Sequence, residues 1–198
     1  MAPVYLDESD PPSKRAVLGA ALRLFAKKGL NGTTIRDIAT EAGFSNPVLF
    51  KYFASRDALA AFLFARCYRA FSMRLASELR APRPFAEKVS VLVDVFLSSM
   101  DEDLDAHVFV QDNLRALWPT LASELRRHSL PGLVRRLLEE GAAEGGLDPT
   151  LDPALLSVAL LGTLTQLARA MYFREVPVQR AVDLQDSVER IFDRLLRT

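Results

Sequence analysis

Apolar side chains recur at helical spacing in a short stretch near the start of the chain. Ile35, Ile38, Ala39 and Ala42 follow the i, i+3, i+4, i+7 pattern, which places one stripe of a helix against a core. Gly43 follows, where a chain commonly leaves a helix through a left-handed residue. The pattern therefore predicts a short helix over residues 35–42 that ends at a glycine.

Two capping signals extend this pattern into a pair of helices. Thr34 followed by Asp37 resembles a capping box, although Asp is a poorer partner than Glu or Gln at that position. Ser45 can accept the first amides of a second helix, and Pro47 falls in the first turn of that helix, where a missing backbone donor costs little. Phe44 and Leu49 are predicted to pack between the two helices. The stretch therefore predicts a helix-turn-helix. An ordinary helical hairpin is the alternative.

The local charge favours the DNA-binding reading over the hairpin. The whole chain is neutral, with 25 basic and 25 acidic residues, yet residues 14–56 hold eight basic residues against two acidic ones. A focused positive field is typical of phosphate binding, whereas a solvated helical surface usually mixes signs. A preceding helix, with Leu18, Leu22 and Phe25 on its buried stripe, completes a three-helix unit.

These residues carry a resemblance to a known family. The runs ALRLFAKKG at 21–29, TTIRDIA at 33–39, AGFS at 42–45, LFKYF at 49–53 and SRDAL at 55–59 look like the N-terminal domain of the TetR family of transcriptional regulators. The rest of the chain resembles that family only by helix pattern. The resemblance implies an all-α fold, with a helix-turn-helix head followed by a helical ligand-binding and dimerisation body.

The sequence departs from the family pattern in the second helix of the motif. Pro47 stands where many members have Gly, and Val48 where many have Thr or Ala. Phe50 replaces a Tyr whose hydroxyl binds phosphate in most members, so we expect that contact to be lost or supplied by Tyr52. Arg56 replaces the usual Lys and keeps a phosphate donor.

The predicted partner is double-stranded operator DNA. Ser45 is one predicted DNA-binding residue, and the others form two sets. Base edges are expected to be read from the exposed side of the motif, by Arg36, Asn46, Pro47 and Val48. Phosphates are expected to be held by hydroxyl or charged donors, namely Thr33, Thr34, Lys51, Tyr52 and Arg56.

Prolines, glycines and acidic clusters divide the remainder into helices. The predicted domains are a disordered arm at residues 1–12, a DNA-binding domain at 13–56 and a ligand-binding and dimerisation domain at 57–198. Within the last domain we predict helices near 55–80, 85–100, 104–117, 119–145 with a bend at Pro131, 153–173 and 181–196.

The last two helices are the predicted homodimer surface. Residues 153–168 carry no charge on any face of the predicted helix. One monomer's core needs only one apolar face, so the remaining apolar surface must be covered in another way. Gly162 would allow a close helix approach, and Leu184, Val188, Ile191 and Leu195 give the final helix an apolar stripe. The alternative is that both helices are internal core.

Large apolar groups with isolated polar heads suggest a cavity for a small hydrophobic effector. The candidate ligand-binding residues are Cys67, Phe71, Phe96, Met100, His107, Gln111, Trp118 and Gln166. Any one aromatic residue at helical spacing is more often part of a protein core than of a ligand pocket. The resemblance implies a pocket among these helices without saying which residues line it.

Several other classes find no support in the sequence. A single cysteine and two distant histidines, His107 and His128, suggest neither a disulfide framework nor a zinc site. No signal peptide is recognisable, and the uncharged run at 153–168 is shorter than the ~20 residues needed to span a bilayer.

The leading prediction is a cytoplasmic, homodimeric regulator without a cofactor, most simply a repressor released from a pseudo-palindromic operator by a hydrophobic ligand. An activator, a ligand-independent regulator and an interaction protein with a vestigial helix-turn-helix stay open. An enzyme is disfavoured because no nucleophile elbow, phosphate loop or dinucleotide turn is present.

Overall fold

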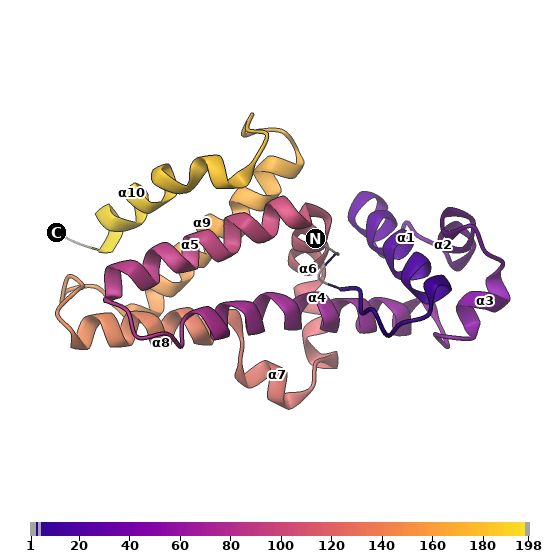
Figure 1. Cartoon of the computed structure of the whole chain (residues 1–198), viewed down its shortest axis with the longest axis horizontal. Coiled ribbons are helices and arrows are strands. Elements are labelled where there is room, and N and C mark those ends of the chain that lie inside the picture. The colour runs from indigo at the N-terminus through magenta and orange to yellow at the C-terminus, as the bar shows by residue number, and fades with distance from the viewer. Residues whose placement is uncertain (1–2, 4, 197–198) are drawn as a thin grey trace. The chain divides into compact units, whose positions relative to one another are not determined.

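The computed structural model describes residues 3 and 5–196, and every element in them is helical (Figure 1). The chain divides into two compact units. The head unit comprises residues 1–70 and 105–121, and the body unit comprises residues 71–104 and 122–198. The predicted domain border after residue 56 falls at the first residue of α4 (Arg56–Glu78), a helix that continues from the head unit into the body unit.

The head unit contains α1 (Pro12–Lys28), α2 (Ile35–Ala42), α3 (Asn46–Phe50), the first part of α4, α6 (Leu104–Leu117) and a short 3-10 turn, η1 (Trp118–Thr120). Its core is built from fully buried side chains of the first four helices, among them Leu18, Phe25, Ile38, Leu49 and Leu63. These are the apolar positions of the sequence pattern, because one stripe of each short helix must be covered.

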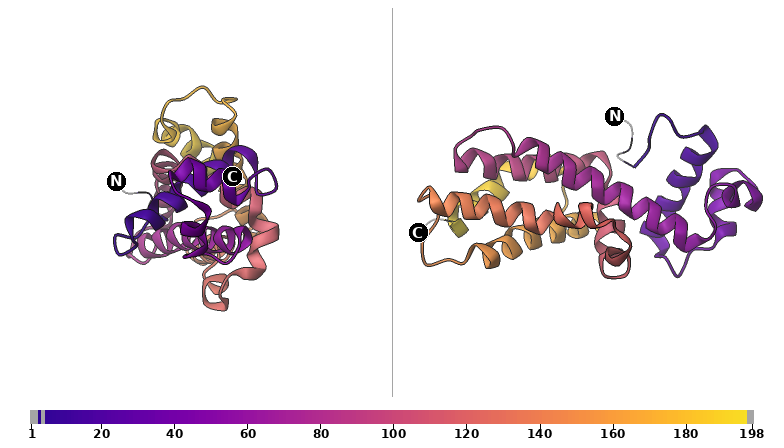
Figure 2. Two further views of the ribbon diagram at one scale, coloured as in Figure 1. Left: turned by 90° about the vertical axis from the view of Figure 1, so that its right-hand side faces the viewer. Right: turned by 90° about the horizontal axis from the view of Figure 1, so that it is seen from below.

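The body unit contains the end of α4, α5 (Phe85–Glu102), α7 (Ser123–Arg127), α8 (Leu130–Ala143), α9 (Pro153–Tyr172), a 3-10 turn η2 (Ala181–Leu184) and α10 (Gln185–Leu196). Helices α8 and α9 run side by side, and α5 packs against α8, α9 and α10 (Figures 1 and 2). Leu92, Val134, Leu160 and Phe192 lie fully buried at the centre of this bundle.

A close approach between α5 and α8 depends on a glycine. A Cβ atom added at Gly141 would lie 2.3 Å from the Phe85 ring, far inside van der Waals contact. At the other end of α5, the Asp101 carboxylate accepts hydrogen bonds from the backbone N–H groups of Ala181 and Val182. The two contacts fix α5 against α8 at one end and against η2 at the other.

The structure departs from the predicted helices at two places. The segment predicted as one bent helix over residues 119–145 is three elements, η1, α7 and α8, because Pro119 and Pro131 each open an element and the chain between them is extended at Ala122 and Ser129. The last predicted helix likewise begins as the 3-10 turn η2 before α10.

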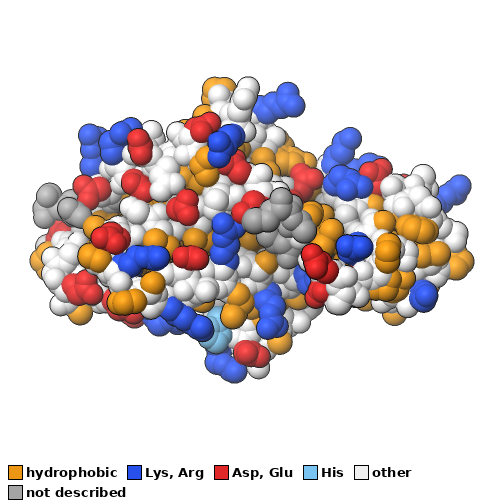
Figure 3. All heavy atoms as spheres, viewed as in Figure 1, with side chains coloured by type: hydrophobic (Ala, Val, Ile, Leu, Met, Phe, Trp, Pro, Cys, Tyr) orange, Lys and Arg blue, Asp and Glu red, His pale blue; other side chains and the backbone are white. Residues whose placement is uncertain are grey.

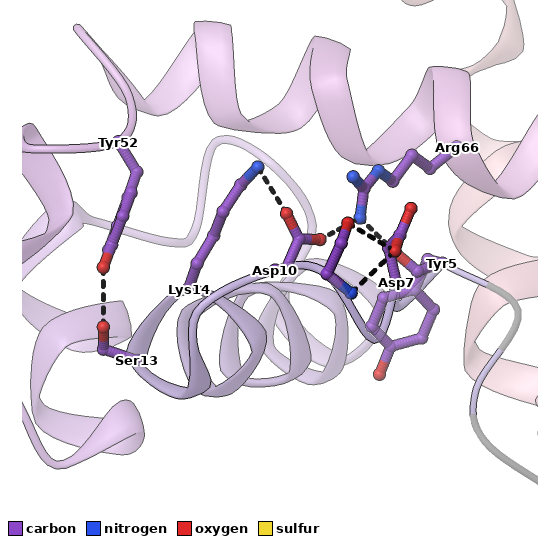
Figure 4. A network of polar contacts seen from close by, with 8 residues as sticks. Tyr5, Asp7, Asp10, Ser13, Lys14, Tyr52 and Arg66 are labelled. Atoms are coloured by element: carbon purple, nitrogen blue, oxygen red, sulfur yellow. Dashed lines mark hydrogen bonds and ion pairs between the residues drawn. The ribbon is translucent and has the colours of Figure 1, made fainter.

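The segment before α1 also differs from the predicted disordered arm. Tyr5 and Asp10 are buried, at 5% and 7% exposure. Asp10 accepts hydrogen bonds from Lys14, at 2.8 Å, and from Arg66 of α4, and Arg66 also donates to the Tyr5 carbonyl at 3.2 Å (Figure 4). Residues 3 and 5–11 are therefore part of the head unit and Pro12 begins α1, while Met1, Ala2 and Val4 lie outside the described residues.

Candidate nucleic-acid interface and effector site

The turn between α2 and α3 follows the predicted geometry. Asp37 donates its backbone N–H to the Thr34 hydroxyl at 3.1 Å, and its carboxylate accepts the Thr34 backbone N–H at 2.9 Å, so the capping box is present. The Thr34 backbone N–H and the Thr34 hydroxyl both donate to the Asp37 carboxylate, and these two hydrogen bonds lower the pKa of that carboxyl. Gly43 ends α2 at φ 75° and ψ 26°, the left-handed conformation that favours glycine.

The start of α3 differs in one respect from the prediction. Ser45 has the extended backbone of an N-cap residue, but its hydroxyl makes no capping hydrogen bond. Pro47 lies in the first turn as predicted, and its missing N–H lowers the number of amides that need a cap. Leu49 is fully buried, whereas Phe44, also predicted to pack between the helices, is 38% exposed.

The predicted base-reading side chains lie on the outside of the motif. Arg36, Asn46 and Pro47 are exposed, and Val48 is half-buried. Phe44 and Phe50 are exposed beside them, so the surface around α3 is apolar as well as basic. Apolar side chains gather over the head unit on the face shown in Figure 3, with Lys and Arg side chains beside them.

Thr33 is a correction among the predicted phosphate contacts. Its side chain is fully buried, and its hydroxyl donates to the carbonyls of Gly29, at 2.9 Å, and Leu24, at 3.2 Å. The hydroxyl is committed to closing the α1–α2 turn, so it cannot reach a phosphate. A Thr beside an exposed Thr34 gives no sequence signal for this inward orientation.

The other predicted phosphate contacts lie at or near the surface. Lys51 is exposed, and its ammonium lies 5.7 Å from the Tyr52 ring. The Tyr52 hydroxyl lies 2.7 Å from that of Ser13, and Arg56 donates to the carbonyls of Leu30 and Thr33 at 2.9 and 3.3 Å (Figure 4 shows the Tyr52 contact). Tyr52 and Arg56 therefore link separate segments of the head unit through hydrogen bonds, and both also lie near its surface.

The predicted effector residues divide between the two units. Cys67, His107, Gln111 and Trp118 belong to the head unit, and Phe71, Phe96, Met100 and Gln166 to the body unit. Cys67 is fully buried, and Phe71, Phe96 and Met100 are also buried. Gln166 is exposed on α9, which corrects its prediction as a cavity-lining anchor.

Aromatic rings connect α6 to the rest of the head unit. Phe109 of α6 stacks on Phe25 of α1, with ring centroids 5.6 Å apart, and meets Phe64 of α4 edge-on at 6.4 Å. Tyr68 stacks on Phe64 at 5.9 Å and meets Trp118 at 5.4 Å. The sequence alone predicted large apolar groups here but not which rings touch, because the pairing is set by tertiary packing.

Two polar groups on α6 are buried, the His107 imidazole and the side-chain oxygen of Gln111. Burial lowers the pKa of His107 to about 3, so its imidazole is neutral at physiological pH. One turn later, the side-chain carbonyl oxygen of Gln111 is buried without a hydrogen-bond partner among the described residues. An unsatisfied buried acceptor costs ~1–3 kcal/mol, so it marks a position where a bound donor would be stabilising.

The fold and the α2–α3 geometry together define a helix-turn-helix DNA-binding protein. Residues 17–63 match the model of the bacterial regulatory proteins of the tetR family, and residues 82–169 match the tetracyclin repressor-like C-terminal domain. The chain belongs to the TetR family and is a DNA-binding transcriptional regulator.

Two curated relatives extend over most of the chain. The fatty acid metabolism regulator protein of Bacillus subtilis (strain 168) is 20% identical over 157 residues, which is 78% of this chain and 81% of that protein. The HTH-type transcriptional repressor KstR2 of Mycolicibacterium smegmatis is 29% identical over 155 residues, covering 75% of this chain and 74% of that protein.

Solved structures share the fold. The ketosteroid transcriptional regulator KstR2 of Mycobacterium tuberculosis superimposes with a TM-score of 0.81 at 19% identity, covering 96% of this chain and 97% of that one. FadR from Bacillus subtilis in complex with stearoyl-CoA gives a TM-score of 0.73 at 20% identity, covering 90% of this chain and 97% of that one.

Helix α9 is long and apolar enough to cross a membrane by those two criteria alone, with a mean hydropathy of 1.4 over its most apolar window. A core or interface helix of a soluble protein meets the same criteria, so this composition is weak evidence for a membrane span. Leu155 and Val158 are 68% and 67% exposed, and a Cβ at Gly162 would meet no atom within 4 Å. One face of α9 is thus apolar and uncovered in the single chain.

Proposed function

We propose that this protein is a cytoplasmic, homodimeric repressor that leaves its operator when a largely hydrophobic small molecule binds. The observation that carries the effector half of this proposal is the unpartnered, buried carbonyl oxygen of Gln111, one turn from the neutral His107. Both residues lie on α6, where the His107 side chain and the Gln111 oxygen are buried. Such a setting suits a ligand that is mostly apolar and brings one hydrogen-bond donor.

The similar proteins support this class of ligand. The Bacillus subtilis relative is named as a regulator of fatty acid metabolism, and the FadR structure holds stearoyl-CoA. The KstR2 structure is described as that of a ketosteroid regulator. Acyl chains and steroid skeletons are both predominantly apolar, which agrees with the buried Phe, Met and Cys side chains of this chain.

A contact within the head unit provides a route from α6 to the DNA-binding helices. Phe109 stands between His107 and Gln111 in the sequence of α6, and its ring stacks on Phe25 of α1. Movement of α6 on ligand binding would therefore act directly on α1, which packs against α2 and α3. A ligand that favours one arrangement of α6 would in this way favour one arrangement of the DNA-binding helices.

The proposed dimer uses the uncovered apolar surface of α9 and α10. Leu155 and Val158 on α9, and Ile191 and Leu195 on α10, are 40–68% exposed. A second copy of the chain would cover them with its own α9 and α10. The dimer would place two α3 helices in successive major grooves of a pseudo-palindromic operator.

Linked binding measurements test the proposal. Operator affinity would be measured by fluorescence anisotropy with and without stearoyl-CoA, stearic acid and a steroid. An effector must lower operator affinity by the same factor by which operator lowers effector affinity. If none of these compounds changes operator affinity, release by acyl or steroid ligands is excluded, and an increase in affinity would indicate a ligand-dependent DNA binder instead.

A further inference from the structure

A groove in the body unit lies between the end of α4, the start of α5 and the middle of α8. Its lining residues are Ala76, Leu79, Arg80, Lys88, Leu133, Arg136, Leu137 and Glu140, and its volume is about 310 Å³. Helix α8 lies beside the end of α4 in both Figures 1 and 2. We call this feature the basic groove. None of the ligand-binding residues predicted from the sequence lines it.

The floor of the basic groove is apolar. Leu133 and Leu137 are 8% and 3% exposed, and Ala76 is 7% exposed. All three belong to the hydrophobic core of the body unit, and Leu79 packs against it. The floor is therefore the outer surface of a packed core, and the small exposed parts of its side chains can contact a few methylene groups.

The rim of the basic groove is predominantly cationic. Lys88 is paired with Glu140 at 2.8 Å. Arg80 and Arg136 are exposed, and neither has a carboxylate within ion-pair distance among the residues that the structure describes. Two guanidinium groups thus stand unpaired beside an apolar floor, and guanidinium groups bind carboxylate and phosphate oxygens in bidentate fashion.

A second groove of the body unit has the opposite charge. It lies between α5 and α10, has a volume of about 370 Å³, and is lined by Asp186, Glu189 and Asp193 with a single cation, Arg190. An anion is repelled there and attracted to the basic groove. The two grooves are similar in volume and share an apolar contribution, so charge is the property that separates them.

We infer that the basic groove binds the anionic end of an amphipathic effector, with a carboxylate or phosphate on Arg80 and Arg136 and the adjoining methylenes on Leu133 and Leu137. This inference rests on the proposed function and names the ligand class more narrowly. A volume at the lower end of the ~300–1,000 Å³ range of ligand pockets fits part of a long-chain molecule rather than all of it.

The test compares four ligands by calorimetry: dodecanoyl-CoA, dodecanoic acid, dodecanol and coenzyme A. The key variant is Arg80→Gln/Arg136→Gln, and the matched control is Arg190→Gln in the acidic groove. We expect the double variant to bind the charged chain ligands at least tenfold more weakly, to bind dodecanol unchanged, and the control to match the wild type. A larger loss for dodecanoyl-CoA identifies phosphate as the bound group, and a larger loss for dodecanoic acid identifies carboxylate.

A gain-of-binding variant separates this role from a purely structural one. Glu140→Gln removes the one carboxylate of the rim and releases Lys88, so anionic ligands should bind several-fold more tightly. Thermal unfolding of each variant checks the fold. Equal affinity of all variants for the charged ligands overturns the inference; if those ligands still lower operator affinity, the proposed function stands. Failure of every ligand to bind the wild-type protein overturns the inference and removes this ligand class from the proposed function.

Discussion

The hydroxyl oxygens of Ser13 and Tyr52 lie 2.7 Å apart, which joins the first turn of α1 to the turn that follows α3. The contact spans 39 residues of sequence and is half-buried. It fixes the end of α3 relative to α1, on which α2 also packs. The hydrogen bond is therefore placed to set the orientation of the helix that we propose reads DNA.

Removing either hydroxyl should give the same loss of stability. We expect Ser13→Ala and Tyr52→Phe each to lower the free energy of unfolding by about 0.5–1.5 kcal/mol, and the double variant to lower it little further, because one hydrogen bond is lost in all three. Urea unfolding measures this. If Tyr52 also holds a phosphate, Tyr52→Phe should weaken operator binding more than Ser13→Ala does. Fully additive losses of stability would show that the two hydroxyls act separately.

Asn46 is exposed in the first turn of α3 and is the proposed reader of an adenine. Asn46→Ala should remove about 1–3 kcal/mol of discrimination at one operator position while leaving the other positions unchanged. Binding to a set of single-base operator variants measures this, with Arg127→Ala in α7 as a control. A binding profile that is merely scaled down at every position would contradict base reading by Asn46.

Lys51 is exposed after α3 and is a proposed phosphate contact. Because a phosphate contact releases a condensed counterion, Lys51→Ala should reduce the slope of log affinity against log salt by about one unit. The same titration of Arg127→Ala, a change in the body unit, should keep the wild-type slope. An unchanged slope in Lys51→Ala would remove that residue from the interface.

Gly162 offers a direct test of the proposed dimer. A Cβ at this exposed position would meet no atom within 4 Å beyond the adjacent helical backbone, and Glu favours a helix over Gly, so Gly162→Glu should fold normally. It would bury a charge in the dimer and should yield monomers that bind the operator weakly. Light scattering and anisotropy measure both effects, with Ala142→Glu at an exposed position of α8 as the charge-matched control. A dimer that survives Gly162→Glu would place the interface elsewhere.

Asp10 should make the head unit sensitive to acid. Burial opposes ionisation of its carboxyl, but hydrogen bonds from Lys14 and Arg66 outweigh burial and lower the pKa. A lowered native pKa stabilises the fold above the ordinary pKa of ~3.9, and that stabilisation is lost as pH falls through the native value. We expect Asp10→Asn to lower the free energy of unfolding by about 1–2 kcal/mol at pH 7. The difference in unfolding free energy between the variant and the wild type should shrink below pH ~4. Urea unfolding across pH measures it, with exposed Glu8→Gln as control; a difference that is independent of pH would contradict this account.

Local signals in the sequence predicted the α2–α3 motif well. The Thr34–Asp37 capping box and the left-handed Gly43 were both predicted and are confirmed, because each depends on residues within one or two turns. The helix starts at Arg56 and Phe85 follow from Ser55, whose hydroxyl accepts the Ala58 N–H at 3.0 Å, and from Pro84, which precedes α5.

Contacts between distant segments could not be predicted in this way. The burial of Tyr5 and Asp10 depends on Arg66, 56 residues beyond Asp10, and an acidic, proline-rich stretch reads as disordered when that partner is unknown. Thr33 has the sequence context of a surface hydroxyl but points inward to the Gly29 carbonyl. The basic groove brings together α4, α5 and α8, so its cations are scattered in the sequence and form no motif.

The complete burial of Cys67 has a practical consequence for measuring motion. Buried thiols react slowly with maleimides, so a cysteine introduced on the surface would be labelled almost alone. Ser45→Cys would put one dye or spin label beside α3 of each protomer. In the proposed dimer, the distance between the two labels would report the separation of the two α3 helices directly as an effector is added.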